Sequence, residues 1–426
     1  MSSAQPSLNP TRGMRDFYPA DMAVRNHIFD AWRAASEHYG FQPYDAPVVE
    51  SLDLLKRKSG EEIVNQIYAF NDKSGRELAL RAEMTPTLAR MVAARMGSLT
   101  LPIKWFTIAQ CFRYERMTRG RKREHFQLNL DVIGETELTA EVEVIATALH
   151  SLTLMGLPPE KVSVRYNSRL LLSALLAFTG VLPEYHAATF LVLDKREKIT
   201  AEQITELLTD AGLPEGQIEA TMAVMRVETL SEAEAMLGPD APAIAQISRF
   251  NHLLAQYGLE DRVSFDIGVI RGLSYYTGIV FEAFDSERSF RAIFGGGRYD
   301  NLLQDVGGKA ETGVGLGFGD VVIGELLTEL GCIDATPAAA EILVGYMQAE
   351  QTESAMRTAN HFRNEGLTVD LALHAEKPKA FFGRAGKRPY RKAVYIGPDD
   401  VAKATIRLKN LDTREESEMP LPCAGC

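Results

Sequence analysis

Two long runs of alternating apolar residues, separated by a strongly basic loop, constrain the fold of this chain more than any other feature. The runs are "IKWFTIAQCFRYER" at 103–116 and "HFQLNLDVIG" at 125–134. Period-two alternation is typical of half-buried β-strands, so the runs predict a long hairpin with residues 119–121 at its tip. The formal net charge of the chain is −11. An acidic chain that concentrates its cations in one loop is a candidate to bind a polyanion there.

A second basic stretch, "KPKAFFGRAGKRPYRK" at 377–392, contains no acid. A single cluster of this kind is usually a solvated loop. Two clusters, the second with Phe381, Phe382 and Tyr390 between its cations, make polyanion binding more credible.

The length and the pattern of elements predict several domains. A chain of 426 residues rarely forms one continuous core. Amphipathic helices with acidic faces predict a helical insertion at 183–261, inside a first domain at 1–330. The segment 331–340 is a plausible linker, and alternating strands and helices at 341–426 predict a small α/β domain with a mostly parallel sheet. The stretch 262–284 predicts a further hairpin.

Several protein classes are disfavoured by composition. No apolar run approaches the roughly 18 residues of a membrane helix, and the first residues lack a signal-peptide core, so we expect a cytoplasmic protein without a membrane partner. The eight histidines are scattered, and Cys423 and Cys426 form one isolated CxxC. We therefore expect no metal site and a reduced C-terminal tail.

Two stretches carry candidate binding residues but are ambiguous on their own. "IFGGGRYD" at 293–300 lacks the order of a phosphate loop, and its glycines more often permit close approach of a ligand or another strand. "RGLSYYTG" at 271–278 pairs two tyrosines, of which periodicity predicts that one is structural. Asp131 shares a strand face with Gln127 and Asn129, and alone it would be expected to pair with a neighbouring arginine.

Together these stretches resemble the histidyl-tRNA synthetases, a family of class II aminoacyl-tRNA synthetases. "RGLSYYTGIVFEA" and "FGGGRYDNLL" are similar to the two histidine-family signatures, and "FRYER…GRKREHFQLNLDVIG" resembles the second class II motif. Pro47 in "YDAPVVES" is similar to the proline of the first motif, which lies at the dimer interface. The resemblance covers nearly the whole chain.

The resemblance implies an α+β fold: an antiparallel catalytic sheet flanked by helices, a helical insertion, and a C-terminal α/β anticodon-binding domain. It implies a homodimeric histidine–tRNA ligase. Such an enzyme activates L-histidine with ATP, assisted by Mg²⁺, to histidyl-adenylate and pyrophosphate, and transfers histidine to the 3′ end of tRNA-His.

The resemblance also implies roles for individual residues. The catalytic residues are expected to be Arg271 and Arg113. The histidine-binding residues are expected to be Glu83, Thr85, Gln127, Asp131, Arg271, Tyr275 and Tyr276. ATP is expected to contact Arg113, Arg121, Arg123, His125 and Phe126, and tRNA to contact Arg116, Arg119, Lys387 and Arg388.

Three positions depart from the family pattern near the expected chemistry. Asp320 stands where the third motif usually carries an arginine for the ATP γ-phosphate, so that contact is expected from the loop arginines or from metal. His125 replaces a phenylalanine that stacks on adenine, and Ser274 replaces an acid.

These departures leave an alternative open. The regulatory subunit of ATP phosphoribosyltransferase is a noncatalytic, histidine-binding paralogue of the synthetases, but it normally lacks the C-terminal domain that this sequence predicts. A plain RNA-binding module would leave Glu83 and Tyr276 unexplained.

Overall fold

The computed structural model describes residues 8–58, 65–196, 199–271, 275–333, 340–387 and 390–423. The chain divides into two compact units, at 1–334 and 335–426. Each unit has its own sheet and hydrophobic core.

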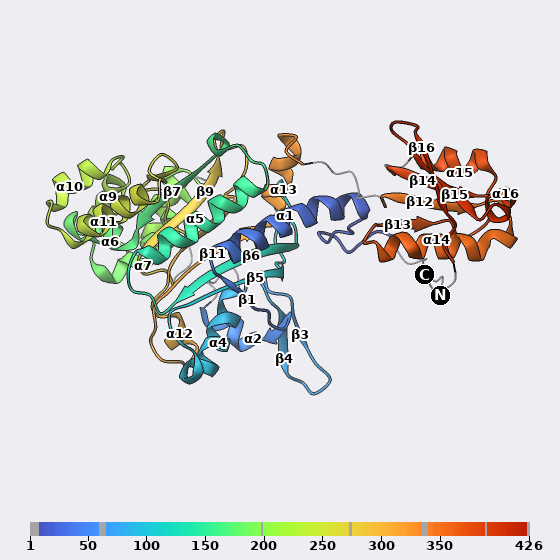
Figure 1. Ribbon diagram of the computed structural model, residues 1–426. Helices are drawn as coiled ribbons and strands as arrows, with labels where there is room; N and C mark the ends of the chain where they lie inside the picture. Colours follow the sequence, from blue (N-terminus) through green and yellow to red (C-terminus); the bar gives the residue numbers. More distant parts are fainter. Residues whose placement is uncertain are drawn as a thin grey trace. The chain divides into compact units, whose positions relative to one another are not determined.

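The first unit is built on an eight-stranded sheet within the described residues (Figure 1). Its inner strands are antiparallel, and a parallel pair lies at each edge. In spatial order the strands are β1 (Gln42–Pro43), β5 (Ile103–Phe112), β6 (Glu124–Ile133), β11 (Gly313–Gly319), β10 (Phe294–Arg298), β9 (Ile279–Asp285), β7 (Val162–Ser168) and β8 (Val263–Phe265).

The predicted basic hairpin is confirmed. β5 and β6 pair from Ile103↔Ile133 to Phe112↔Glu124, and an isolated bridge joins Thr118 to Arg121 at the tip. The hairpin predicted at 262–284 is wrong, because β8 and β9 do not pair with each other: both pair with β7, which lies between them.

Helices cover one face of this sheet. Even-numbered side chains of β6, such as Leu128 and Leu130, share a buried cluster with Trp32 and Ile145. The ring of Trp32 packs edge-on against Phe318 of β11, with 5.2 Å between the centroids. The covering helices are α1 (Pro19–His38), α5 (Thr139–Leu154) and α13 (Asp320–Glu329). Because strand side chains alternate, the odd-numbered side chains of β6 point to the other face.

The remaining elements of the first unit surround this sheet. A small sheet orders β2 (Val49–Ser51), β4 (Glu77–Leu80) and β3 (Ala69–Asn71), next to α2 (Leu52–Lys58), α4 (Thr85–Arg95) and α12 (Leu302–Asp305). The helices between β7 and β8 are α6 (Arg169–Phe178), α7 (Pro183–Leu193), α8 (Ala201–Asp210), α9 (Glu215–Val224), α10 (Leu230–Leu237) and α11 (Pro242–Gln256).

The second unit is a sheet with helices on both faces. Its strand order is β13 (Val369–Leu371), β12 (Ile342–Tyr346), β14 (Lys392–Ile396), β15 (Thr405–Asn410) and β16 (Glu416–Pro420). α14 (Thr352–Asn364) packs on one face and α15 (Pro378–Ala385) on the other, and α16 (Pro398–Ala402) follows β14. The predicted mostly parallel sheet is wrong, because among the described strands of this unit only the β12 pairings with β13 and β14 are parallel.

Two further expectations concern the chain as a whole. Cys423 is disulfide-bonded, so the expected reduced state is wrong for that residue; Cys426 lies outside the described residues. Within the described ranges, no single helix is long and apolar enough to cross a membrane, and only the bent pair α6 and α7 meets that test by length and composition.

A buried ion pair ties the sheet to α5. Nε of Arg298 lies 2.7 Å from Oε1 of Glu141, and Nη2 lies 2.7 Å from Oε2. Removing one partner of a buried pair leaves an uncompensated charge, which costs about 3–5 kcal/mol, whereas replacing both can be nearly neutral.

We therefore predict that Arg298→Met lowers the free energy of unfolding of the first unit by about 3–5 kcal/mol. Arg298→Met combined with Glu141→Leu is expected to cost less than either single change. Urea unfolding followed by tryptophan fluorescence measures this selectively, because both tryptophans of the chain, Trp32 and Trp105, lie in the first unit. Additive losses in the double variant would contradict the prediction.

Candidate active site

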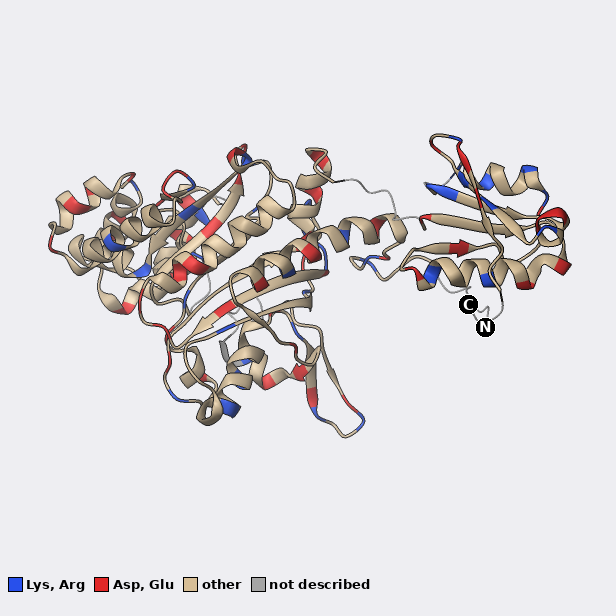
Figure 2. Ribbon diagram, viewed as in Figure 1, with Lys and Arg blue, Asp and Glu red and all other residues tan. Residues whose placement is uncertain are grey.

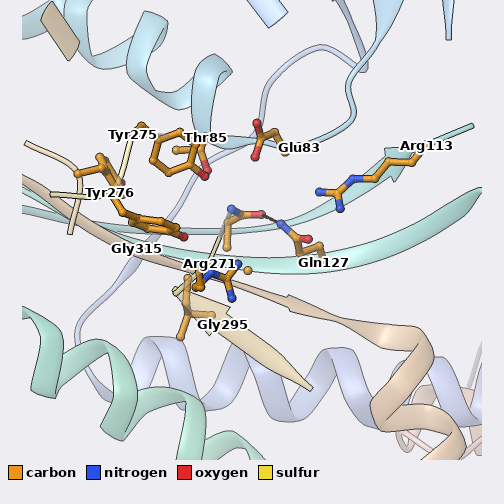
Figure 3. A pocket seen from close by; sticks show the side chains of 13 residues that line it. Glu83, Thr85, Arg113, Gln127, Arg271, Tyr275, Tyr276, Gly295 and Gly315 are labelled. Carbon is orange, nitrogen blue, oxygen red and sulfur yellow. Dashed lines mark hydrogen bonds between the residues drawn. The ribbon is translucent and has the colours of Figure 1, made fainter. Parts of the chain in front are cut away.

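A pocket lies over the sheet face that the helices leave uncovered. It is lined by residues from four regions far apart in sequence: the start of α4 with the residues just before it, the β5–β6 hairpin, the residues around 271–276, and the glycine-rich strands β10 and β11 with Tyr299. In Figure 3, Glu83 and Thr85 lie on one side and Arg271 on the other, with Arg113 and Gln127 at one end and the paired tyrosines at the other. The predicted residues that line it are Glu83, Thr85, Arg113, Gln127, Arg271, Tyr275 and Tyr276.

Arg271 lies directly on the backbone of β10. A Cβ atom built at Gly295 would meet Nη1 of Arg271 at 1.6 Å, so any other residue there would displace the guanidinium. The same Nη1 donates to Oε1 of Glu282 at 3.0 Å, on the neighbouring strand β9. Arg271 also has a φ of 54°, which a non-glycine residue adopts only when its surroundings enforce it.

The backbone of Arg271 is held by Arg169, at the start of α6. The guanidinium of Arg169 donates to the carbonyl oxygen of Arg271. It also lies over the ring of Phe190 in α7, 4.4 Å from the centroid. Burial lowers the pKa of Arg169 to about 10, against the attraction of Asp194. Through Arg169 and Phe190, Arg271 is thus connected to α7, the first helix of the predicted insertion at 183–261.

Asp131 occupies a buried position beneath the pocket. Its Oδ1 accepts a hydrogen bond from the Tyr299 hydroxyl at 2.5 Å, and it lies where a Cβ at Gly315 would be, at 2.2 Å. Among the described residues, Oδ2 of Asp131 has no hydrogen-bond partner. Burial raises the pKa of this carboxyl to about 7, although the Tyr299 hydrogen bond acts to lower it. Tyr299 replaces the neighbouring arginine expected as its partner.

The polar strand face continues from Asp131 toward the hairpin tip. Nε2 of Gln127 donates to Oδ1 of Asn129 at 2.9 Å, and the ring of His125 lies 3.4 Å from Oε1 of Gln127. Burial and the charge of Arg113 lower the pKa of His125 to about 3, so its ring is neutral. Nε of Arg113 donates to the carbonyl of Ala82 at 3.0 Å, which aims the guanidinium beside Glu83.

The other predicted site residues lie outside the pocket lining. The ring of Phe126 points to the helix-covered face and packs against Phe29 with 5.2 Å between centroids, so of the two proposed adenine contacts only His125 shares the strand face with Gln127. Arg121 pairs with Glu115 at 2.5 Å. Arg123 lies over the ring of Tyr114, and Arg119 pairs with Glu329 at 2.6 Å; Arg116 follows Glu115 in the same loop.

The second basic stretch is divided between surface and core. Phe381 and Tyr390 are buried in the second unit, so these aromatics are structural, whereas Phe382 is exposed. Lys387 is exposed and follows α15, on whose ribbon Figure 2 colours the basic residues blue. Arg388 and Ser274 lie outside the described residues. Both tyrosines at 275–276 line the pocket, and Tyr275 is also part of a buried hydrophobic cluster, in keeping with the expectation that one of the two is structural.

Sequence reasoning missed a second group of residues at the site. Arg169 carried no motif that marked it, and Glu282 and Tyr299 were seen only as members of the two family signatures, without a role of their own. The glycines at every second position of "TGVGLGFG" could have indicated that one face of this strand lies against the pocket, because alternate residues of a strand face the same side. The lining also contains Asn129 and Gly295, which belong to stretches singled out in the sequence, and Tyr299, Gly315, Leu316 and Gly317, which were not assigned to the site.

The fold and the site define a class II aminoacyl-tRNA synthetase architecture. The crystal structure of histidyl-tRNA synthetase from Nostoc superposes with a TM-score of 0.80 at 22% identity and covers 98% of this chain and 97% of that chain, which shows the shared fold. A family model described as histidyl-tRNA synthetase matches residues 13–319, and an anticodon binding domain matches 341–422.

Relatives extend the match over nearly the whole chain, which belongs to the histidyl-tRNA synthetase family. It is 40% identical to the chloroplastic/mitochondrial histidine–tRNA ligase of Arabidopsis thaliana, over 97% of this chain and 85% of that protein. It is 38% identical to the histidine–tRNA ligase of Opitutus terrae, over 96% of this chain and 95% of that protein.

From the contact between Arg271 and Gly295 we predict that a larger residue at position 295 lowers activity. Gly295→Ala is expected to displace the guanidinium and to weaken the reaction catalysed at this pocket by about 100-fold, the order of loss that a small misplacement causes. The measurement is kcat/KM together with the thermal unfolding midpoint. Gly97→Ala is a matched control, because nothing lies within 4 Å of a Cβ there. Unchanged kcat/KM in Gly295→Ala would show that the contact is not needed.

Asp131 predicts a pH dependence of stability. Its pKa in the folded protein, about 7, is above its ordinary value of 3.8, so its contribution to stability is fully present below the ordinary value and is lost as the pH rises through about 7. Asp131→Asn stays neutral. Its unfolding midpoint is therefore expected to rise relative to that of the unmodified protein as the pH rises from the ordinary pKa of 3.8 to about 7, and to stay level above that.

Thermal unfolding at several pH values measures this difference. Glu287→Gln, at a side chain that is 75% exposed, serves as the control. A difference in midpoint that does not change with pH would contradict a raised pKa at Asp131.

Proposed function

We infer that this chain is a histidine–tRNA ligase that forms histidyl-adenylate from L-histidine and ATP and then charges tRNA-His. The observation that carries the proposal is the convergence of Arg113 and Arg271 on one pocket that also contains Glu83 and Gln127. A pocket that holds two guanidinium groups and a carboxylate suits an amino acid whose carboxylate is activated while its amino group is held.

The residues support a division of labour in the first step. Glu83 and Thr85 would hold the α-amino group, with Gln127 nearby, while Asp131 would face the imidazole together with Tyr276. The unpartnered Oδ2 of Asp131 supports this, because a buried acceptor needs a donor and an imidazole N–H provides one.

Arg113 and Arg271 would stabilise the reacting phosphate. Attack of the histidine carboxylate on the α-phosphorus develops negative charge on the phosphoryl oxygens, and pre-positioned cations lower that barrier without a strong base. Nε of Arg271 is buried and has no hydrogen-bond partner among the described residues, so it is available to a ligand oxygen. ATP would enter as its magnesium complex, with the ion held largely by phosphate oxygens and water.

Transfer to tRNA would use the basic hairpin loop and the second unit. Arg116 and Arg119 on the loop would contact the acceptor end, and Lys387 and Arg388 would contact the anticodon region. The match of residues 341–422 to anticodon binding domains supports the second assignment. Arg121 and Arg123 would turn from Glu115 and Tyr114 toward the ATP phosphates.

The wider organisation is part of the proposal. We place the catalytic domain at 1–330 with its insertion at 183–261, a linker at 331–340 and the anticodon-binding domain at 341–426. The active form would be a cytoplasmic homodimer. Dimerisation is supported by three exposed apolar side chains. Val48 and Val49 follow Pro47 directly, and Phe70 lies on the same three-stranded sheet as Val49.

A noncatalytic regulatory paralogue is less well supported. Such a protein needs neither an anticodon-binding domain nor arginines converging on a phosphate. The relatives described above carry the name histidine–tRNA ligase, and the C-terminal match is to an anticodon-binding domain.

Histidine-dependent exchange of pyrophosphate into ATP tests the proposal. We expect exchange with histidine and not with other amino acids, and charging of tRNA-His in a second assay. Histidine binding without exchange would overturn the proposed activity in favour of a regulatory protein.

Arg271→Ala is predicted to reduce exchange by about 100- to 1000-fold, the loss typical of removing one charge-stabilising group. Histidine binding, measured by calorimetry, should be largely retained, because other residues hold the amino group and the imidazole. Arg76→Ala, at a side chain that is 75% exposed, is the control and should be fully active. Near-normal exchange in Arg271→Ala would remove that residue from the mechanism.

A further inference from the structure

Asp320 is the most conspicuous departure from the family pattern, and its surroundings differ from those of a phosphate ligand. It is the first residue of α13, is 5% exposed, and is not among the residues that line the pocket. Its carboxylate is instead engaged on both oxygens by other parts of the protein.

Oδ1 of Asp320 extends the hydrogen bonding between β11 and β6 by one residue. The two strands pair as far as Gly319↔Gln127, so Phe126 is the next residue opposite Asp320. At that point the chain has turned into α13, and the backbone of β11 no longer offers an acceptor. Oδ1 of Asp320 provides one, accepting a hydrogen bond from the backbone N–H of Phe126 at 2.9 Å.

The second oxygen pairs with an arginine from the N-terminal segment. Nη2 of Arg15 lies 3.0 Å from Oδ2 of Asp320 and 2.7 Å from Oε1 of Glu124. Both acids are buried, and one guanidinium between them compensates part of their charge. Burial raises the pKa of Asp320, and the charge of Arg15 acts against that rise.

The same N-terminal segment contacts the start of β6 at two more places. The backbone N–H of Arg123 donates to the carbonyl of Gly13 at 3.0 Å. The ring of Phe17 packs edge-on against Phe126 with 5.9 Å between centroids. The first residues of β6 are therefore fixed from the helix-covered face, while His125 and Gln127 point to the opposite face.

We propose that Arg15 and Asp320 are positioning residues that fix residues 125–127 of β6 for nucleotide and histidine binding, and that Asp320 does not contact a phosphate. The proposal rests on the proposed ligase function. It assigns Asp320 a structural acceptor role at the position where the resemblance led us to expect an arginine, and leaves the cations of loop 113–123 to bind the far phosphates.

Three substitutions separate the acceptor role from the charge. Asp320→Ala removes both the acceptor for Phe126 and the negative charge. It is expected to raise KM for ATP about tenfold and to lower kcat, because residues 125–127 would move out of their binding positions. Asp320→Asn keeps an acceptor for Phe126 and should be intermediate. Asp320→Arg should be the most damaging, because it offers no acceptor and repels Arg15.

Hydrogen–deuterium exchange provides a readout that does not depend on activity. In a peptide that covers 124–127, exchange is expected to be faster in Asp320→Ala and close to normal in Asp320→Asn. Arg15→Ala should resemble Asp320→Ala, and Arg15→Lys should recover part of the loss. Glu287→Ala is the matched control, as an exposed acid 3.9 Å from Lys161, and should change neither quantity.

Each result decides the proposal. The proposal would be overturned if Asp320→Ala showed normal hydrogen–deuterium exchange and normal kinetic constants. It would also be overturned if deuterium exchange became faster while KM and kcat stayed unchanged. A lower KM for ATP in Asp320→Arg would also overturn it, because position 320 would then face the phosphates. If the unmodified protein catalyses no histidine-dependent pyrophosphate exchange, the ligase function fails. Deuterium exchange still tests whether Arg15 and Asp320 fix residues 125–127.

Discussion

The active-site architecture depends on the close approach of polar side chains to bare strand backbone. Arg271 lies on Gly295, Asp131 lies against Gly315, and a Cβ at Gly317 would meet Gln127 at 2.7 Å. These glycines belong to the central strands β10 and β11, where a glycine interior costs stability. The cost is offset by the packing of the opposite face, where Phe294 and Phe318 share a core with Trp32. One sheet thus serves as a packed wall on one side and as a binding surface on the other.

Charge on the binding face is only partly compensated inside the protein. Glu282 pairs with one nitrogen of Arg271, and Tyr299 holds one oxygen of Asp131. The other oxygen of Asp131 and Nε of Arg271 are buried without a partner among the described residues. Unsatisfied buried groups are costly, so they are informative about the ligand that completes them. A zwitterionic amino acid with an imidazole and an activated carboxylate offers groups complementary to these.

Local patterns predicted the elements that depend on local chemistry. The alternation at 103–116 and 125–134 predicted the β5–β6 hairpin. Partner choice between strands was not predictable in the same way: β8 and β9 both pair with β7, which is distant in sequence. Aromatics within a basic run were also ambiguous, since Phe381 packs inside the second unit while its neighbour Phe382 is exposed.

The candidate site shows the same limit. Residues within motifs, such as Arg113, Gln127 and Arg271, were identified from the sequence, whereas residues that act through another side chain were not. Arg169 holds the carbonyl of Arg271 from α6, and Arg15 reaches Asp320 across the fold. Such contacts depend on tertiary structure and leave no periodic trace in the sequence.

The most direct test of this account is a crystal structure of the protein with a non-hydrolysable analogue of histidyl-adenylate. We expect the imidazole within hydrogen-bond distance of Asp131, the amino group beside Glu83, and the phosphate substitute between Arg113 and Arg271. An analogue bound with its imidazole away from Asp131, or with its phosphate substitute against Asp320, would contradict the account.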